Sequence, residues 1–251
     1  MLCKVIVCCF FVFSLCSLSQ AQDNEKIQLA DDVFVEKITD HVWRHVSSKN
    51  VPNFGLVPSN GVIAQFGTDI LLIDSAWNDA QTKLVLDWIE KELKAKPAVA
   101  VITHAHDDRI GGIHEIHRRG IRTLSSALTA ELAKQQGIEV PQQTFDETLT
   151  LTLGRREVLV RYPGPGHTRD NIVVWLPDQE ILVGGCLIKS TQAKNIGNTK
   201  DADLAQWPKT IEKIQQEFKQ VKIVVPGHDD PSGVEAMTRT LELLRNVAQR
   251  K

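Results

Sequence analysis

The sequence lacks a strong charge imbalance, a low-complexity segment and internal repeats. Its formal net charge is -2 over 251 residues, so it has no basic excess of the kind that favours nucleic-acid binding. No Gly/Ser-rich linker interrupts residues 22–251, and we therefore expect one domain there. The chain also lacks a G-x-S-x-G motif, which excludes a hydrolase built on that type of nucleophilic serine.

Long apolar runs are also missing, apart from one at the N-terminus. Lys4 precedes an apolar stretch at 5–15, and the segment SLSQAQ that follows offers a small-residue cleavage site ending at Ala21. This pattern is typical of a secretory signal peptide over residues 1–21. The run is shorter than the roughly 20 residues that span a bilayer, so we expect no stable membrane insertion and a periplasmic mature protein. A bulky leucine directly before Cys16 fits lipoprotein processing poorly.

Cysteine is scarce in the expected mature chain. Four of the five cysteines fall within the signal peptide, so Cys186 alone remains. It has no partner for an internal disulfide, and a lone thiol in an oxidising compartment needs burial or a bound group. By composition alone, a buried apolar cysteine is the simpler interpretation. The motifs described below favour a bound metal instead.

Hydrophobic patterns predict two similar halves, each with strands followed by helices and a further strand. In the first half we expect strands at 33–38, 41–46, 61–66, 69–74 and 97–103, and helices at 80–96, 109–120 and 125–137. In the second half we expect strands at 148–153, 156–163, 171–177, 180–185 and 222–226, and helices at 202–218 and 232–249. Two such halves packed sheet to sheet, with the helices outside, would form an α/β fold of four layers, an αββα sandwich.

The stretch ITHAHDDRIGG, residues 102–112, directly follows a buried strand. His104 and His106 are two residues apart, so in extended backbone both imidazoles point the same way. Asp108 lies two residues further on and can share that site or hold a neighbouring ion. The spacing HxHxD therefore indicates a metal site at the C-terminal end of a strand.

Three further residues of metal-ligand type lie beside glycines near strand ends. His167 lies in GPGHTRDN, Cys186 in GGCLIK and His228 in VVPGHDD. Each alone has an ordinary interpretation, as a turn histidine, a core cysteine or a surface histidine. Together with HxHxD they favour one shared site, since histidine, cysteine and aspartate are all ligands that zinc accepts.

The motifs HAHDDR, GPGHTRDN, GGCLIK and PGHDD resemble those of the metallo-β-lactamases, and the cysteine resembles the ligand of subclass B1. The resemblance covers nearly all of residues 30–251 in order and spacing. It implies an αββα sandwich with two zinc ions. The implied ligands are His104, His106 and His167 for the first ion, and Asp108, Cys186 and His228 for the second.

Two details distinguish the sequence from wider relatives. Arg109 follows Asp108, whereas glyoxalase II and similar hydrolases resemble HxHxDH, with histidine at that position. Cys186 stands where such hydrolases usually have a bridging aspartate. His104 also separates the chain from a subclass that has asparagine in place of the first histidine.

The resemblance implies hydrolysis of the amide bond of penicillins, cephalosporins and carbapenems by a metal-bound hydroxide, and hence antibiotic resistance. Asp108 would hold the second zinc and orient the hydroxide. Lys189 would pair with the substrate carboxylate, and Asn198 would polarise the lactam carbonyl. The ordinary alternatives are a solvated lysine and a turn residue beside Gly197.

Several neighbours complete the expected site. The loop at 50–61 resembles the mobile flap of these enzymes, with Phe54 covering apolar substrate groups; packing of this ring on the body is the alternative. Trp77 is expected in the wall of the groove or in the core. Asp74 and Arg109 are expected to pair and to steady the HxHxD loop, either in support of the site or as a plain structural ion pair.

Four other histidines have simpler interpretations. We expect His114 and His117 to flank solvent, because isoleucines take the inner face of their helix, and we expect no convergent partners for His41 or His45. Two other functions remain open. One is a thioesterase or other hydrolase on the same scaffold, and the other is a non-catalytic metal-binding protein, which would need four protein ligands at each ion. We expect a monomer that acts on a small molecule, with substrate preference set by loops 51–58 and 190–198.

Overall fold

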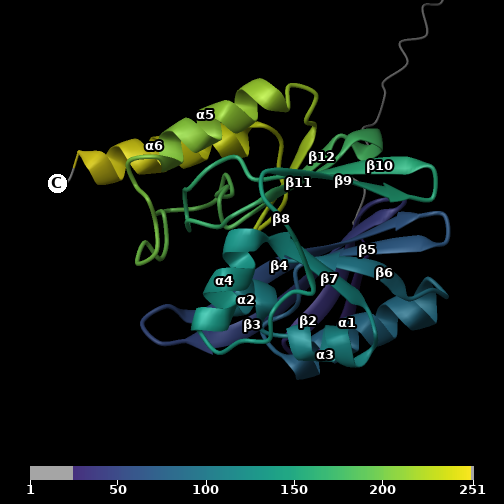
Figure 1. The fold of residues 1–251 in the computed structure, drawn as a ribbon. Coiled ribbons are helices and arrows are strands. Elements are labelled where there is room, and N and C mark those ends of the chain that lie inside the picture. The colour runs from purple at the N-terminus through teal and green to yellow at the C-terminus, as the bar shows by residue number, and fades with distance from the viewer. Residues whose placement is uncertain (1–24, 250–251) are drawn as a thin grey trace, which may run out of the picture.

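The structure, a computed structural model, describes residues 25–249. It contains two β-sheets that face each other, with helices on their outer sides (Figure 1). The expected signal peptide, residues 1–21, lies outside the described residues. Within residues 25–249, no helix combines the length and apolar character needed to cross a membrane.

The first sheet has eight strands whose order in space follows their order in the sequence. Neighbours from β1 to β5 are antiparallel, and those from β5 to β8 are parallel. The strands are β1 (Lys26–Ala30), β2 (Val33–Thr39), β3 (Val42–Val51), β4 (Gly55–Phe66), β5 (Asp69–Ile73), β6 (Pro97–Val101), β7 (Arg122–Ser126) and β8 (Gln143–Phe145). Parallel neighbours need crossover connections, so helices follow β5, β6 and β7.

The second sheet has five strands in the order β13-β12-β11-β10-β9. They are β9 (Thr148–Leu153), β10 (Arg156–Arg161), β11 (Val173–Leu176), β12 (Ile181–Gly185) and β13 (Ile223–Pro226). The helices are α1 (Asp79–Glu92), α2 (Asp107–Ile110), α3 (Ile113–Arg118), α4 (Ala127–Gln135), α5 (Trp207–Glu217) and α6 (Glu235–Ala248), with a 3-10 turn, η1, at Pro177–Gln179. The parallel pair β12–β13 is joined through α5, so both strands end at the same edge of the sheet.

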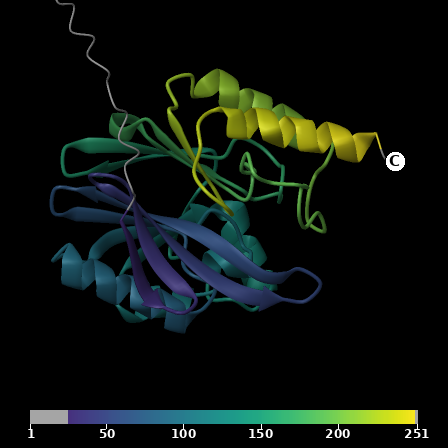
Figure 2. The ribbon, with the colours of Figure 1, turned by 180° about the vertical axis from the view of Figure 1, so that it is seen from behind.

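Apolar side chains fill three interfaces, and this produces four layers. Leu71 and Val101 of the first sheet belong to the same buried cluster as Val160 and Val174 of the second. The outer faces are covered by α1 and α3 on the first sheet and by α5 and α6 on the second (Figures 1 and 2). Each fully buried Val, Leu or Ile contributes about 1.5–3 kcal/mol. The expected αββα sandwich is confirmed.

The segment at 50–61 is more regular than the sequence suggested. It is mostly strand, because β3 and β4 pair continuously from Val42↔Ala64 to Val51↔Gly55 and form a long hairpin (Figure 2). Pro58 is tolerated because this part of β4 has a neighbour on one side only; pairing with β5 begins at Val62. The turn is made by the short segment before Gly55, where Asn53 has a φ of 67°.

Other differences are local. Strands β1, β7 and β8 were not expected. The sequence of β7, for example, is RTLSS, which lacks an apolar run. Ser126 ends β7 and caps α4, because its side chain accepts a hydrogen bond from the Thr129 N–H. Helix α5 begins five residues later than expected, at Trp207. The carboxylate of Asp203 accepts from the N–H groups of Ala205 and Gln206 and holds a turn ahead of the helix.

Candidate metal centre

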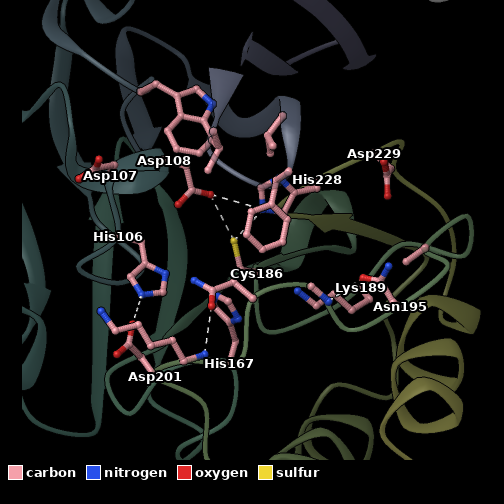
Figure 3. A pocket seen from close by; sticks show the side chains of 18 of the residues that line it. His106, Asp107, Asp108, His167, Cys186, Lys189, Asn195, Asp201, His228 and Asp229 are labelled. Atoms are coloured by element: carbon pink, nitrogen blue, oxygen red, sulfur yellow. Dashed lines mark hydrogen bonds and ion pairs between the residues drawn. The ribbon is translucent and has the colours of Figure 1, made fainter. Parts of the chain in front are cut away.

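Six side chains of metal-ligand type converge at the edge where the two sheets meet, and Figure 3 labels all of them except His104. The segment after β6 carries three of them, and three more come from the β10–β11 turn and from the ends of β12 and β13. Their ligand atoms form three overlapping groups, within each of which all atoms lie within 4.8 Å of one another. The groups are His104, His167 and Cys186; His104, His106 and Asp108; and Asp108, Cys186 and His228.

Three imidazoles form one side of the cluster. The ring centroid of His104 lies 4.8 Å from that of His106 and 5.2 Å from that of His167, and the last two are 5.2 Å apart. Burial lowers the pKa of His104 and of His167 well below the ordinary value, so both rings are neutral and keep a lone pair. Buried nitrogens of both rings, His104 Nε2 and His167 Nδ1, have no hydrogen-bond partner. A bound cation would satisfy such orphaned nitrogens.

The other side of the cluster combines a carboxylate, a thiol and an imidazole. Cys186 Sγ lies 3.4 Å from Asp108 Oδ2 and 3.3 Å from His228 Nε2. His228 Nδ1 donates to the Pro58 carbonyl at 2.7 Å, so its Nε2 carries the lone pair that faces the sulfur. Burial lowers the pKa of His228 to about 4, which keeps this ring neutral.

The two acidic members are tuned in opposite directions. Burial raises the pKa of the Cys186 thiol to about 12, and the neighbouring guanidinium of Arg109 only partly offsets this. Burial also acts to raise the pKa of Asp108, but the neighbouring positive charge of Arg109 opposes this, and the pKa lies well below the usual range. A buried thiol of this kind becomes a strong ligand when a cation displaces its proton. Nitrogen, sulfur and carboxylate donors therefore fit a metal ion here.

Arg109 is fully buried beneath the carboxylate–thiol side. Its Nη2 donates to Asp108 Oδ2 at 2.8 Å, to Cys186 Sγ at 3.2 Å and to the Gly227 carbonyl at 2.7 Å. Its Nη1 lies 3.4 Å from Asp74 Oδ2. The carboxylates and the thiol together keep the pKa of Arg109 raised despite the opposing effect of burial. One guanidinium thus contacts the segments after β6, β12 and β13 at once.

Asp74 closes this buried network at the end of β5. It has a left-handed backbone, with φ 64°, and its carboxylate accepts from Thr103 N at 2.7 Å and Thr103 Oγ1 at 2.8 Å. Burial raises the pKa of Asp74 to about 6, although Arg109 and Thr103 oppose the shift. Asp74 therefore fixes the backbone just before His104.

A cavity of about 480 Å³ opens beside the cluster. Besides five of the converging side chains, it is lined by Phe54, Trp77, Lys189 and Asn198. Lys189 is 8 % exposed, and its Nζ lies 5.5 Å from the centroid of the Trp207 ring. Burial lowers the pKa of this lysine. Asn198 accepts from Lys200 N at 3.0 Å, which leaves its side-chain N–H free to donate.

The exposed hydrophobic side chains Phe54 and Leu56 lie at the tip of the β3–β4 hairpin, with 56 % and 65 % of their surface accessible. Trp77 is half-buried, and Lys49 Nζ lies 5.4 Å from its ring centroid. Lys49 also pairs with Asp107 Oδ2 at 3.2 Å, which links the hairpin to the first residue of α2. The hairpin and the floor of the cavity are therefore joined by an ion pair.

Sequence reasoning missed Asp201. Its Oδ2 lies 3.0 Å from His106 Nε2 (Figure 3). A carboxylate on one ring nitrogen places the proton there and leaves Nδ1 bare for a metal. The only signal in the sequence is an acidic residue three positions after Asn198, which is too common to single out.

One histidine outside the cluster differs from expectation. His117 does not flank solvent: its side chain is 10 % exposed and contacts Glu139 Oε1 at 2.5 Å and Thr123 Oγ1 at 2.6 Å, so it ties α3 to the segment before β8. His45 is buried, and its Nε2 lies 3.2 Å from the Asp74 carbonyl. His114 is exposed, as expected, and lies 3.3 Å from Asp79. None of these rings reaches the cluster.

Removal of the Asp201 carboxylate gives the first prediction. Asp201→Ala is expected to weaken metal binding at the three-histidine side by about 10–100-fold, because His106 loses the partner that fixes its ring and tautomer. Competition between the apo-protein and a chromogenic chelator measures this affinity. Lys200→Ala, at the exposed neighbouring position, is the matched control and is expected to bind like the unaltered chain. Equal affinities for both variants would contradict the assignment.

Comparison with known proteins agrees with this architecture. The family model described as "Metallo-beta-lactamase superfamily" matches residues 54–228. A "Metallo-beta-lactamase type 2" of Bacteroides fragilis is 37% identical over 240 residues, covering 96% of this chain and 96% of that protein. Another, of Bacillus cereus, is 40% identical over 213 residues, covering 85% and 83%.

Solved structures show the same likeness. A metallo-β-lactamase from Pontibacter korlensis superposes with a TM-score of 0.83 at 42% identity, covering 85% of this chain and 99% of that one. The metallo-β-lactamase FIM-1 from Pseudomonas aeruginosa, described in a mono-zinc form, gives a TM-score of 0.80 at 38% identity, covering 88% and 99%. The match of motifs, fold and sequence shows that this chain belongs to the metallo-β-lactamase superfamily.

Proposed function

We propose that this hydrolase cleaves the amide bond in the ring of β-lactam antibiotics with the help of two zinc ions. One observation carries the proposal: three imidazoles and a carboxylate–thiol–imidazole group converge beside a cavity that is also lined by a buried lysine. Relatives at 37–40% identity over most of the chain carry the name metallo-β-lactamase. Penicillins, cephalosporins and carbapenems are the proposed substrates.

The donor set divides between the two proposed ions. His104, His106 and His167 would hold the first, and Asp108, Cys186 and His228 the second. Three protein ligands per ion leave a position open for water or substrate. Zinc in such a site lowers the pKa of water to about 7 and polarises a carbonyl.

The chain's own residues supply binding and orientation. Lys189 keeps a positive charge in a largely dehydrated position, where a substrate carboxylate would be attracted more strongly than at an exposed lysine. The free side-chain N–H of Asn198 would donate to the lactam carbonyl oxygen. Asp108, held by Arg109, presents a carboxylate that accepts a hydrogen bond and would orient the attacking water. Phe54 and Trp77 provide apolar surface for substituents of the substrate.

The test is turnover of a chromogenic cephalosporin with and without a chelator. We expect turnover that the chelator abolishes and added zinc restores. A thiol ester is assayed in parallel, because a thioesterase on the same scaffold is the second candidate. Absence of cephalosporin hydrolysis at every zinc concentration would remove the proposal, and thiol ester turnover in its place would establish the alternative.

A prediction follows for the buried lysine. Lys189→Ala is expected to raise KM for carboxylate-bearing β-lactams by about 10–100-fold with a smaller change in kcat, since hydrogen bonds to charged groups contribute about 1.5–3 kcal/mol. Lys194→Ala is the matched control, because this exposed lysine lines the same cavity and is expected to leave KM nearly unchanged. Similar KM values for the two variants would argue against the role of Lys189.

We also propose that residues 1–21 direct export and that the mature enzyme acts as a periplasmic monomer. The pattern of Lys4, the apolar run and the small residues up to Ala21 supports export. Cell fractionation and the N-terminal sequence of the exported protein test this. A full-length chain retained in the cytosol would contradict it.

A further inference from the structure

The residue after His228 has an unusual backbone. Asp229 has a φ of 62°, in the left-handed region that favours glycine. A non-glycine residue keeps such a conformation only where its surroundings hold it. The backbone of Asp229 is therefore held by its neighbours, and this constrains the direction in which the adjoining His228 leaves the chain.

Two side chains of the opposite sheet hold the next peptide, between Asp229 and Asp230. The carbonyl of Asp229 accepts from Arg44 Nη1 at 2.9 Å and from Asn60 Nδ2 at 2.6 Å. Asn60 also donates to the Pro226 carbonyl at 2.9 Å, so both ends of the PGHD turn are tied to the β3–β4 pair. Arg44 is 7 % exposed, and Glu36 on β2 holds it in place through an ion pair.

The same arginine is linked through Asp230 to the segment that carries Lys189. Its Nη2 donates to Asp230 Oδ1 at 2.7 Å, and the other oxygen of that carboxylate accepts from Gln192 Nε2 at 3.0 Å. Next to Lys189, Ser190 Oγ donates to Asp229 Oδ2 at 2.7 Å. The turn with His228 and the segment after Cys186 are thus joined to each other and fastened to the first sheet through Arg44.

We propose that Arg44 is a positioning residue: through the Asp229 carbonyl it holds His228 against Cys186 and Asp108. The inference rests on the proposed metal site. If the proposal holds, the metal affinity of the carboxylate–thiol–imidazole side depends on Arg44, although Arg44 contacts none of the three ligand side chains. The three-histidine side has no such link to Arg44.

Cobalt(II) titration of the apo-protein tests the proposal. Cobalt bound to a thiolate gives a charge-transfer absorption, so the Cys186 side reports separately from the three-histidine side. The unaltered chain is expected to bind two equivalents. Arg44→Met is expected to bind the first normally and to need about 10–100-fold more cobalt to reach the thiolate absorption. Arg44→Lys keeps the charge and one donor and is expected to fall in between.

Arg119→Met is the matched control. Arg119 is 13 % exposed and pairs with Asp87, Glu90 and Glu115 in the outer helical layer. It is expected to lower stability without changing either cobalt affinity. Thiolate absorption in Arg44→Met at the cobalt concentration of the unaltered chain would overturn the proposal, and so would an equal loss in Arg119→Met.

Two further outcomes are decisive. If Arg44→Met does not fold, Arg44→Lys carries the test: selective weakening of the thiolate signal supports the proposal, and an unchanged signal overturns it. If the unaltered chain gives no thiolate absorption at all, the proposed metal site itself is refuted, and that result is distinct from a failure of the Arg44 inference alone.

Discussion

The Cys186→Ser substitution is expected to lower kcat/KM for a chromogenic cephalosporin by more than about 100-fold, because even groups that only hydrogen-bond to metal ligands contribute about 10–100-fold. A serine hydroxyl keeps its proton near neutral pH and cannot replace the thiolate as an anionic ligand. The substitution also removes the sulfur atom of Cys186, which Arg109 Nη2 contacts at 3.2 Å. Metal content is expected to fall from two ions toward one.

Elemental analysis of dialysed protein, alongside steady-state kinetics, measures both effects. Cys186→Asp is the informative comparison, since a carboxylate restores a negative charge at that position and is expected to recover more of the second ion than serine does. Unchanged kinetics and metal content in Cys186→Ser would refute Cys186 as a ligand.

Arg109→Met is expected to have the largest effect on stability, lowering the free energy of unfolding by about 3–5 kcal/mol. The side chain is fully buried, and its removal leaves the carboxylates of Asp74 and Asp108 without their cation. The Gly227 carbonyl also loses its donor. Urea unfolding of the metal-free protein measures the loss without a contribution from bound ions.

Arg118→Met is the control for Arg109→Met. Arg118 is 55 % exposed and pairs with Glu115 on the same helix, so its loss is expected to cost at most about 1 kcal/mol. Comparable destabilisation by both variants would show that the buried network around Arg109 contributes nothing beyond an ordinary surface pair.

The layered fold was predictable because its strands are apolar and its helices amphipathic. The strands that escaped prediction lack those signals: β7 is rich in hydroxyl side chains, and β8 has three residues. The outer part of the β3–β4 hairpin, residues 50–61, was expected to be a loop, because Pro52, Gly55 and Pro58 are typical of breaks in a strand. Pairing with β3 along one side overrides that local signal.

The six converging residues were predictable for a different reason. Each lies at or near the end of a strand, and strands of one sheet that emerge at a common edge bring their following residues together. Arg44, Asn60 and Asp201 gave no such signal. In the sequence Arg44 is an ordinary charged residue of a predicted strand, and its contact with Asp229 joins positions 185 residues apart. Contacts of this kind follow only from the packing of one sheet on the other.

Three of the six residues lie on a segment of the first sheet, and three lie on segments of the second. Zinc bound between them would act as a cross-link from one half of the chain to the other, which neither half can form alone. Mass action then adds about 2.7 kcal/mol to the folded state when free metal exceeds its dissociation constant a hundredfold. Zinc limitation in a cell would therefore have two effects. It would stop catalysis, and it would destabilise the contact between the two halves of the chain, so that proteases would degrade more of the enzyme.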